Sequence, residues 1–153
     1  MKIFSMKFVK IFMLFMFFLS ASIPFINGLG CDFSFYYEDE KIINHGVCRA
    51  GVIDLVINDK ITGSVVRESM WWGVFGNAFY GYVIERELVK PYDHLSSRTA
   101  LFEKTKFLSG RYAFVDKQLL ATYIKHPTEM VRLNNINGKL AFFSNKEDIN
   151  VLE

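Results

Sequence analysis

The 153-residue sequence lacks the short motifs that mark the common cofactor-dependent enzymes. It has no phosphate-binding glycine loop, no dinucleotide fingerprint and no H-E-x-x-H zinc motif. It also has no internal repeat, and no low-complexity segment follows the first thirty residues. The sequence therefore gives no support for nucleotide-dependent or zinc-dependent catalysis. We predict no cofactor and no metal site.

The chain also lacks an excess of charge of either sign. Its net charge is +2, but three of its 18 basic residues lie in the first thirty positions, where there is no acidic residue. Residues 31–153 therefore hold 18 − 3 = 15 basic and 16 acidic residues, which gives −1. A nucleic-acid-binding domain needs a basic surface. We therefore predict no nucleic-acid partner.

Cysteine is scarce, with only Cys31 and Cys48. In an oxidising compartment two such cysteines are expected to pair. A disulfide closing a loop of this length stabilises the fold by about 3 kcal/mol in the chain-entropy model. The competing interpretation is a lipoprotein in which Cys31 is acylated, which would exclude the disulfide and leave Cys48 free.

The first thirty residues have the order of a secretory signal peptide. Three lysines precede nine consecutive apolar residues at positions 11–19, and small and polar residues follow. Two sites fit the small-x-small cleavage rule, Ser20-Ala21-Ser22 and Gly28-Leu29-Gly30. We predict that residues 1–30 are a signal peptide or membrane anchor and that residues 31–153 form a single exported globular domain, periplasmic or secreted.

Two alternatives to cleavage remain open. The stretch Ile11–Cys31 carries no charge and is long enough to span a bilayer if it is never removed. Pro24 and Gly28 weaken its second half as a lipid-embedded helix. Lipoprotein signals usually place leucine three residues before the cysteine, where this chain has Gly28. Membrane contact is thus expected only through residues 1–30 or a lipidated Cys31.

The stretch Arg67–Glu87 is the strongest predicted hairpin, with Gly76-Asn77 as a II′ turn. A two-residue loop pairs Phe75 with Ala78 but sets like charges opposite each other further along the strands. The register shifted by one pairs Phe75 with Phe79. It also sets Glu68 against Arg86, and for this reason we favour it slightly.

The remaining elements complete an α+β class, a mainly antiparallel sheet of about five to seven strands with one or two helices. In the strand Gly51–Ile57, the face with Ile53, Leu55 and Ile57 is the expected core face, with Asp54 at the surface. The other segments are expected strands at 31–40 (an edge strand) and 61–68, and a helix at 116–125. The segment 98–108 fits a helix, and nearly as well a strand that pairs through Ser109-Gly110 with 111–115. A C-terminal hairpin is expected from strands 130–136 and 139–144, turning at Asn137-Gly138.

Candidates for catalysis are few. His45 and Cys48 form an H-x-x-C pair that could serve a small hydrolase, although a disulfide would remove the thiol. The chain lacks the further cysteine and histidine ligands of a zinc site. Glu68, Glu85 and Glu87 could form an acidic pair, but neighbouring arginines favour an exposed ion-pair rim. We predict no catalytic residue.

The predicted function is an exported binding or inhibitory module without catalysis. It would recognise a protein or envelope partner through the aromatic hairpin. A small secreted hydrolase and a membrane-anchored accessory protein are the alternatives. Trp and Tyr are favoured anchors at interfaces, and the predicted binding residues are Trp71, Trp72, Phe79, Tyr80 and Tyr82.

Overall fold

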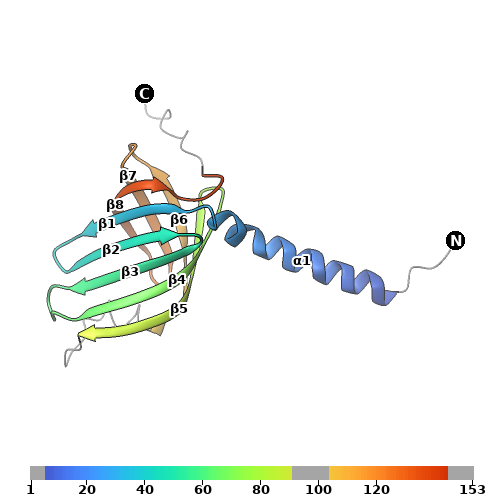
Figure 1. Ribbon diagram of the computed structural model, residues 1–153, viewed down its shortest axis with the longest axis horizontal. Coiled ribbons are helices and arrows are strands. Elements are labelled where there is room, and N and C mark those ends of the chain that lie inside the picture. The colour runs from blue at the N-terminus through green and yellow to red at the C-terminus, as the bar shows by residue number, and fades with distance from the viewer. Residues whose placement is uncertain (1–5, 91–103, 145–153) are drawn as a thin grey trace.

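The computed structural model describes residues 6–90 and 104–144, which form an N-terminal helix and eight antiparallel strands closed into a barrel (Figure 1). Neighbouring strands pair in chain order, and β1 pairs with β8 to close the barrel. The elements are α1 (Met6–Gly28), β1 (Asp32–Glu38), β2 (Ile42–Arg49), β3 (Val52–Asp59), β4 (Val65–Phe75), β5 (Ala78–Lys90), β6 (Phe107–Phe114), β7 (Leu119–His126) and β8 (Met130–Lys139).

The predicted α+β class is therefore wrong, although the antiparallel sheet is confirmed. Eight strands close on themselves instead of forming an open sheet of five to seven. The segment expected to be an edge strand, 31–40, contains β1, which is paired on both sides with β2 and β8. Closure removes the exposed strand edges that an open sheet would leave.

Side chains alternate between the interior and the outer surface along each strand, as β3 shows. Ile53, Leu55 and Ile57 are buried inside, while Asp54 is exposed, as the sequence predicted. Alternate side chains of a strand point to opposite faces, so one face of every strand can contribute to a single enclosed core.

The helix predicted at 116–125 is wrong, because this segment contains the strand β7. Leu120 and Ile124 are buried, and between them the half-buried Thr122 also lines the interior. A threonine at an inward position hides the two-residue period and leaves an apparent helical stripe. The helix predicted at 98–108 falls mostly on residues 91–103, outside the described residues, and its last two residues begin β6.

The hairpin turn predicted at Asn137-Gly138 is also wrong. Both residues lie within β8, where they pair with Ser34 and Phe33 of β1. Gly138 has a φ of 115°, and a Cβ at this position would lie 2.1 Å from the Asp32 carbonyl oxygen. The glycine therefore allows close approach of two backbones where the barrel closes.

The hairpin of β4 and β5 combines both predicted registers. Its turn lies at Gly76-Asn77, with Phe75 paired to Ala78 as a two-residue loop requires. A register shift between Ser69 and Met70 then changes the pairing along the strands. Beyond it the second register holds, in which Glu68 faces Arg86. A β-bulge of this kind lets the turn and the charged pairs both be satisfied.

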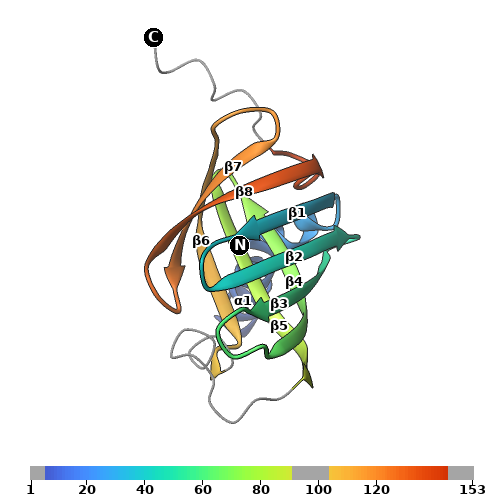
Figure 2. The ribbon, with the colours of Figure 1, turned by 90° about the vertical axis from the view of Figure 1, so that its left-hand side faces the viewer.

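Different strand connections lie at the two ends of the barrel. At the helix end, α1 leaves the barrel, and the connections β2–β3, β4–β5 and β6–β7 lie there. The far end carries the connections β1–β2, β3–β4 and β7–β8, and Figure 2 views the molecule from that side with α1 behind the barrel.

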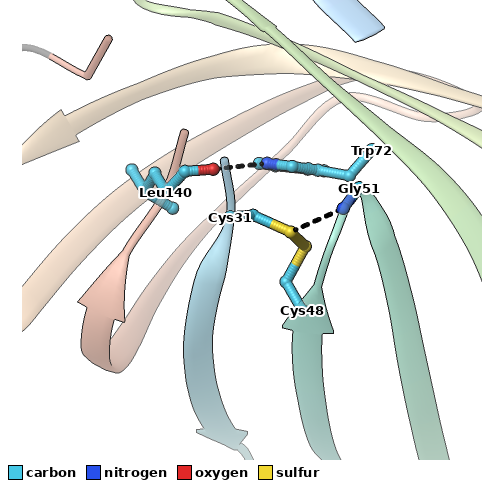
Figure 3. Close-up of a disulfide and its surroundings, with 5 residues drawn as sticks. All are labelled: Cys31, Cys48, Gly51, Trp72 and Leu140. Atoms are coloured by element: carbon cyan, nitrogen blue, oxygen red, sulfur yellow. Dashed lines mark hydrogen bonds between the residues drawn. A yellow bond between two sulfur atoms is a disulfide. The ribbon is translucent and has the colours of Figure 1, made fainter. Parts of the chain in front are cut away.

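The helix end holds the predicted disulfide, which is confirmed. Cys31 and Cys48 are bonded, with their Cα atoms 5.7 Å apart (Figure 3). The Gly51 amide donates to the Cys31 sulfur at 3.3 Å. Nearby, the Trp72 indole donates to the Leu140 carbonyl at 3.0 Å. A sulfur in a disulfide cannot carry a lipid thioether, so Cys31 in this bonded form is not available for acylation.

Candidate functional site: the barrel interior

The barrel encloses a cavity of about 130 Å³. Its wall at the helix end is aromatic: Trp72 stacks on Phe79 with ring centroids 5.4 Å apart, and Phe33 meets Trp72 edge-on at 5.8 Å. The cavity lining continues past Leu55 toward residues near the far end, such as Pro127. An eight-stranded barrel is just wide enough to be filled by side chains or to hold one small ligand.

An ion pair lies inside this largely apolar cavity. The Arg86 Nε lies 2.7 Å from Glu68 Oε1, and both residues line the cavity. Glu68 is only 4% exposed. A second Arg86 nitrogen donates to the Thr105 carbonyl at 3.0 Å. A buried carboxylate needs such a partner, because taking an unpaired charge out of water is costly.

A second polar group lines the cavity from β2, β7 and β8. With its amide oriented to satisfy its neighbours, Asn44 accepts from an Arg132 nitrogen at 2.7 Å. The Arg132 guanidinium also lies over the Tyr37 ring, 4.9 Å from its centroid. The Asn134 amide donates to the Thr122 hydroxyl at 2.9 Å. These side chains place hydrogen-bonding groups around an apolar space.

The charged groups of the lining are unequal in number. Among the described lining residues, Arg86 and Arg132 are cationic and Glu68 is the single carboxylate. Two guanidiniums and one carboxylate thus line the cavity, and the ionised Asp39 lies just outside the lining near Arg132. A guanidinium carries several N–H donors in one plane, so the two arginines favour a ligand with a negative or hydrogen-bond-accepting group.

Asp39 lies beside this cluster in the β1–β2 turn at the far end. Burial opposes its ionisation, but the amides of Ile42 and Lys41 donate to its carboxylate at 2.7 Å each. The Tyr37 hydroxyl donates at 2.9 Å. Together with the nearby Arg132 charge, these bonds hold the pKa of Asp39 below its usual value. The turn is thus fixed by a carboxylate that stays ionised.

The five predicted binding residues are divided between the two faces of the hairpin. Trp72 and Phe79 point inward, are buried and line the cavity. Trp71 and Tyr82 point outward and are exposed, and Tyr80 lies half-buried on the same outer face. The structure does not bring all five together. It assigns two of them to the interior and leaves three on the surface.

The predicted alternatives for catalysis lose their geometry. Cys48 is fully buried in the disulfide and has no thiol to act as a nucleophile. His45 is exposed on the outer face of β2. The predicted acidic pair is separated, since Glu68 points inward while Glu85 and Glu87 are exposed on the outside. The Glu68–Arg86 pair is consequently buried and is not the exposed rim that we expected.

Groups of three or more histidine, cysteine or acidic side chains that could hold a metal ion are not found in residues 6–90 and 104–144. The charged side chains of the cavity are instead paired with one another or with polar groups, as described above.

Sequence reasoning missed the polar cavity residues Asn44, Thr122, Arg132 and Asn134. Each stands between two inward positions of its strand, as Asn44 does between Ile42 and Gly46. The signal that could have found them is a polar residue at a position that the strand's alternation assigns to the inward face. Without knowledge that the strands close around a cavity, such residues break the expected alternation.

We compared the sequence with models of protein families and with curated proteins. No family model matches it, and no curated protein matches it significantly.

Proposed function

We propose that this protein is a non-catalytic binding barrel that holds a small, mainly apolar molecule with an anionic or hydrogen-bond-accepting group. One observation carries the proposal. The interior contains a cavity of about 130 Å³ with an aromatic wall at the helix end and two arginines, Arg86 and Arg132, in the part of the lining toward the far end. Native interiors are close-packed and contain few voids larger than a water molecule. A cavity of this size is therefore a candidate ligand site.

The volume limits the ligand. A cavity of comparable size, lined by leucine, isoleucine and phenylalanine, is known to bind benzene. Typical pockets for drug-sized molecules are larger, roughly 300–1,000 Å³. The fit is thus to a single ring or a short hydrocarbon chain, and not to a large cofactor.

The two arginines determine which end of the ligand points where. Arg132 and Arg86 lie among the polar residues, while Trp72 and Phe79 lie at the opposite end of the cavity. An amphipathic molecule would place its apolar part against the rings and its acceptor group near a guanidinium. A straight-chain alkanoate is the simplest probe with this chemistry.

The test uses the full chain in lipid nanodiscs, with empty nanodiscs correcting for partitioning. The variant Trp71→Phe leaves Trp72, at the cavity wall, as the only tryptophan. Alkanoates from butanoate to decanoate are titrated while Trp72 fluorescence is followed. Each added methylene should tighten binding about fourfold until the cavity is full. An affinity that rises with chain length without a limit, or no binding at all, contradicts the proposal.

The head group is tested with matched alkanols. They have the same chain but lack the carboxylate, so a contact between that carboxylate and a guanidinium predicts weaker binding of each alkanol than of its alkanoate. Equal affinities would show that Arg86 and Arg132 do not interact with the ligand.

For the compartment, the confirmed disulfide indicates an oxidising environment. In addition, α1 contains 21 residues, Phe8–Gly28, that are long and apolar enough to cross a membrane. A signal peptide near the N-terminus meets the same criterion. We propose that the barrel is exported and faces the oxidising side of a membrane.

A protein partner remains the second candidate, because exposed aromatics lie on the outer face of the hairpin. Trp71 and Tyr82 are 53% and 42% exposed. They could anchor a partner as the sequence predicted. Replacing Trp71 should then abolish that interaction and leave alkanoate binding unchanged.

A further inference from the structure

The end of α1 is built into the barrel. The Asn27 side chain donates to the Val74 carbonyl at 2.9 Å and to the Phe143 carbonyl at 3.1 Å, and it accepts from the Phe143 amide at 2.8 Å. The Asn27 carbonyl accepts from the Phe142 amide at 3.0 Å. One asparagine thus connects the helix to β4 and to the chain that follows β8.

Close packing accompanies these bonds. A Cβ on Gly28 would lie 2.0 Å from the Trp72 carbonyl oxygen, so only glycine fits there. Leu29 packs against Gly51 in the same way, with a methyl carbon 2.9 Å from a Cβ built at that glycine. The second of the two predicted cleavage sites, Gly28-Leu29-Gly30, therefore lies within a contact between helix and barrel.

Next to this contact, the outer face of the barrel carries an aromatic row. Trp71, Tyr82 and Phe107 lie on adjacent strands β4, β5 and β6 and are paired across them in register. They are 53%, 42% and 41% exposed. The rings of Trp71 and Tyr82 lie 6.1 Å apart. We call these three residues the outer aromatic row.

An apolar groove separates the outer aromatic row from α1. Phe18, Ala21 and Phe25 of the helix line one side, and the row lines the other. The mainly apolar span Phe8–Gly28 of the helix is 21 residues long, about 32 Å at the rise of an α-helix. This matches the hydrocarbon thickness of a bilayer, about 30 Å.

We infer that α1 is retained as a membrane anchor and that the outer aromatic row rests in the interfacial layer of the same bilayer. Trp and Tyr are enriched where a protein crosses that layer, because their rings combine an apolar body with a polar group. The row shares its groove with the helix. A bilayer that surrounds the helix therefore reaches the row without any further partner.

This inference does not depend on the ligand proposed for the interior. It concerns the outer face of the barrel, whereas the ligand site lies inside. Trp71 and Trp72 are neighbours in sequence but point to opposite sides of β4, so they report on the two surfaces separately.

The test measures tryptophan quenching in the full chain reconstituted into phosphatidylcholine–phosphatidylglycerol vesicles. The quencher is a lipid that carries a spin label near its head group. The wild-type protein should be quenched, and Trp71→Phe should remove most of that quenching. In the matched control, Trp72→Phe, Trp71 remains and quenching should persist. If quenching is absent, or survives Trp71→Phe unchanged, the row does not touch the bilayer.

Two other occupants give different results. If a second copy of the chain covers the row, Trp71 is not quenched in the vesicles and the chain is recovered from them as a dimer. If a soluble protein covers it, vesicles of the purified chain show quenching that the partner abolishes, and the partner then competes with lipid for the row. The first result overturns the inference, and the second confirms that lipid contacts the free row.

The anchor is tested by the mass of the protein extracted from the membranes of cells that produce it naturally. Retention predicts a chain that still contains α1. A mature protein that begins at Ile23 or Cys31 would overturn the inference, because most or all of the helix would be lost.

Discussion

The helix end and the far half of the barrel interior are lined by different kinds of side chains. At the helix end, Trp72 and Phe79 stack, the Cys31–Cys48 disulfide closes a loop, and α1 is fixed by Asn27. Further along, charged and amide groups enter the interior. The first arrangement is apolar and cross-linked. The second costs free energy to bury unless its groups are paired with one another.

This difference separates stability from binding within one small fold. Buried polar groups add little to stability compared with apolar residues of the same volume. Their presence beside a cavity supports the ligand site that we propose. Changes at the disulfide and at the contact between α1 and β4 should alter stability and leave binding intact, and changes among the polar groups should alter both.

The largest effect is expected from Glu68→Gln. It leaves the Arg86 charge inside the barrel without its carboxylate partner, which costs about 3–5 kcal/mol of unfolding free energy. Urea unfolding of the full chain in mild detergent measures this loss. The double variant Glu68→Met with Arg86→Met should recover most of it, because no charge of the pair is then buried. A double variant as unstable as the single one would contradict the role of the pair.

The next effect concerns the disulfide. Replacing Cys31 and Cys48 together by alanine should lower the unfolding free energy by about 3 kcal/mol, because the unfolded chain regains the freedom of the loop. Urea unfolding measures the loss. Alkanoate affinity, measured below the unfolding transition, should not change. A clear loss of affinity would mean that the two ends are coupled and that the comparison is wrong.

A smaller effect is expected where α1 meets β4. Gly28→Ala introduces a Cβ against the Trp72 carbonyl and should cost about 1–3 kcal/mol, the usual range for overpacking. Ser20→Ala is the matched control, since the Ser20 hydroxyl bonds only to the Met16 carbonyl of the same helix. Thermal unfolding followed by circular dichroism compares the two variants. Equal transition temperatures would show that the helix end is not packed on the barrel.

The smallest effect depends on pH. The pKa of Asp39 is lowered in the folded state, so its contribution to stability is present above the unfolded value of about 3.9 and is lost as pH falls through the folded value. Asp39→Asn should therefore be less stable than wild type near neutral pH, by less than about 1 kcal/mol for such a partly exposed group. The gap should narrow as pH falls below the unfolded value and through the lowered pKa of folded Asp39. If the difference in unfolding free energy between wild type and Asp39→Asn does not change with pH, the difference does not come from the ionisation of Asp39.

The sequence allowed local features to be predicted better than the closure of the sheet. The inward face of β3, the turn at Gly76-Asn77 and the Cys31–Cys48 disulfide are confirmed. Each depends on residues close in sequence or on a residue type with one dominant chemistry. The pairing of Glu68 with Arg86 was also predicted, but its position inside the barrel was not.

The failures have a common physical cause. Asn44 in β2 and Thr122 in β7 are polar residues at inward positions, and they obscure the two-residue period by which a strand is recognised. Gly46 occupies another inward position, where a Cβ would lie 2.3 Å from a ring carbon of Phe35. The glycine leaves room for this ring, and that need becomes visible only when β1 is placed beside β2. Asn44 and Thr122 also line the cavity, so the strands hardest to predict carry the candidate site.

The most direct measurement of the central claim is alkanoate titration of a variant whose cavity is filled. Val83 lines the cavity and is partly buried. Val83→Phe should occupy the empty space and leave the barrel folded, as circular dichroism can verify. We predict that octanoate binding to this variant, followed by Trp72 fluorescence in the Trp71→Phe background, falls at least tenfold. Unchanged affinity in a folded variant would show that the ligand does not bind inside the barrel.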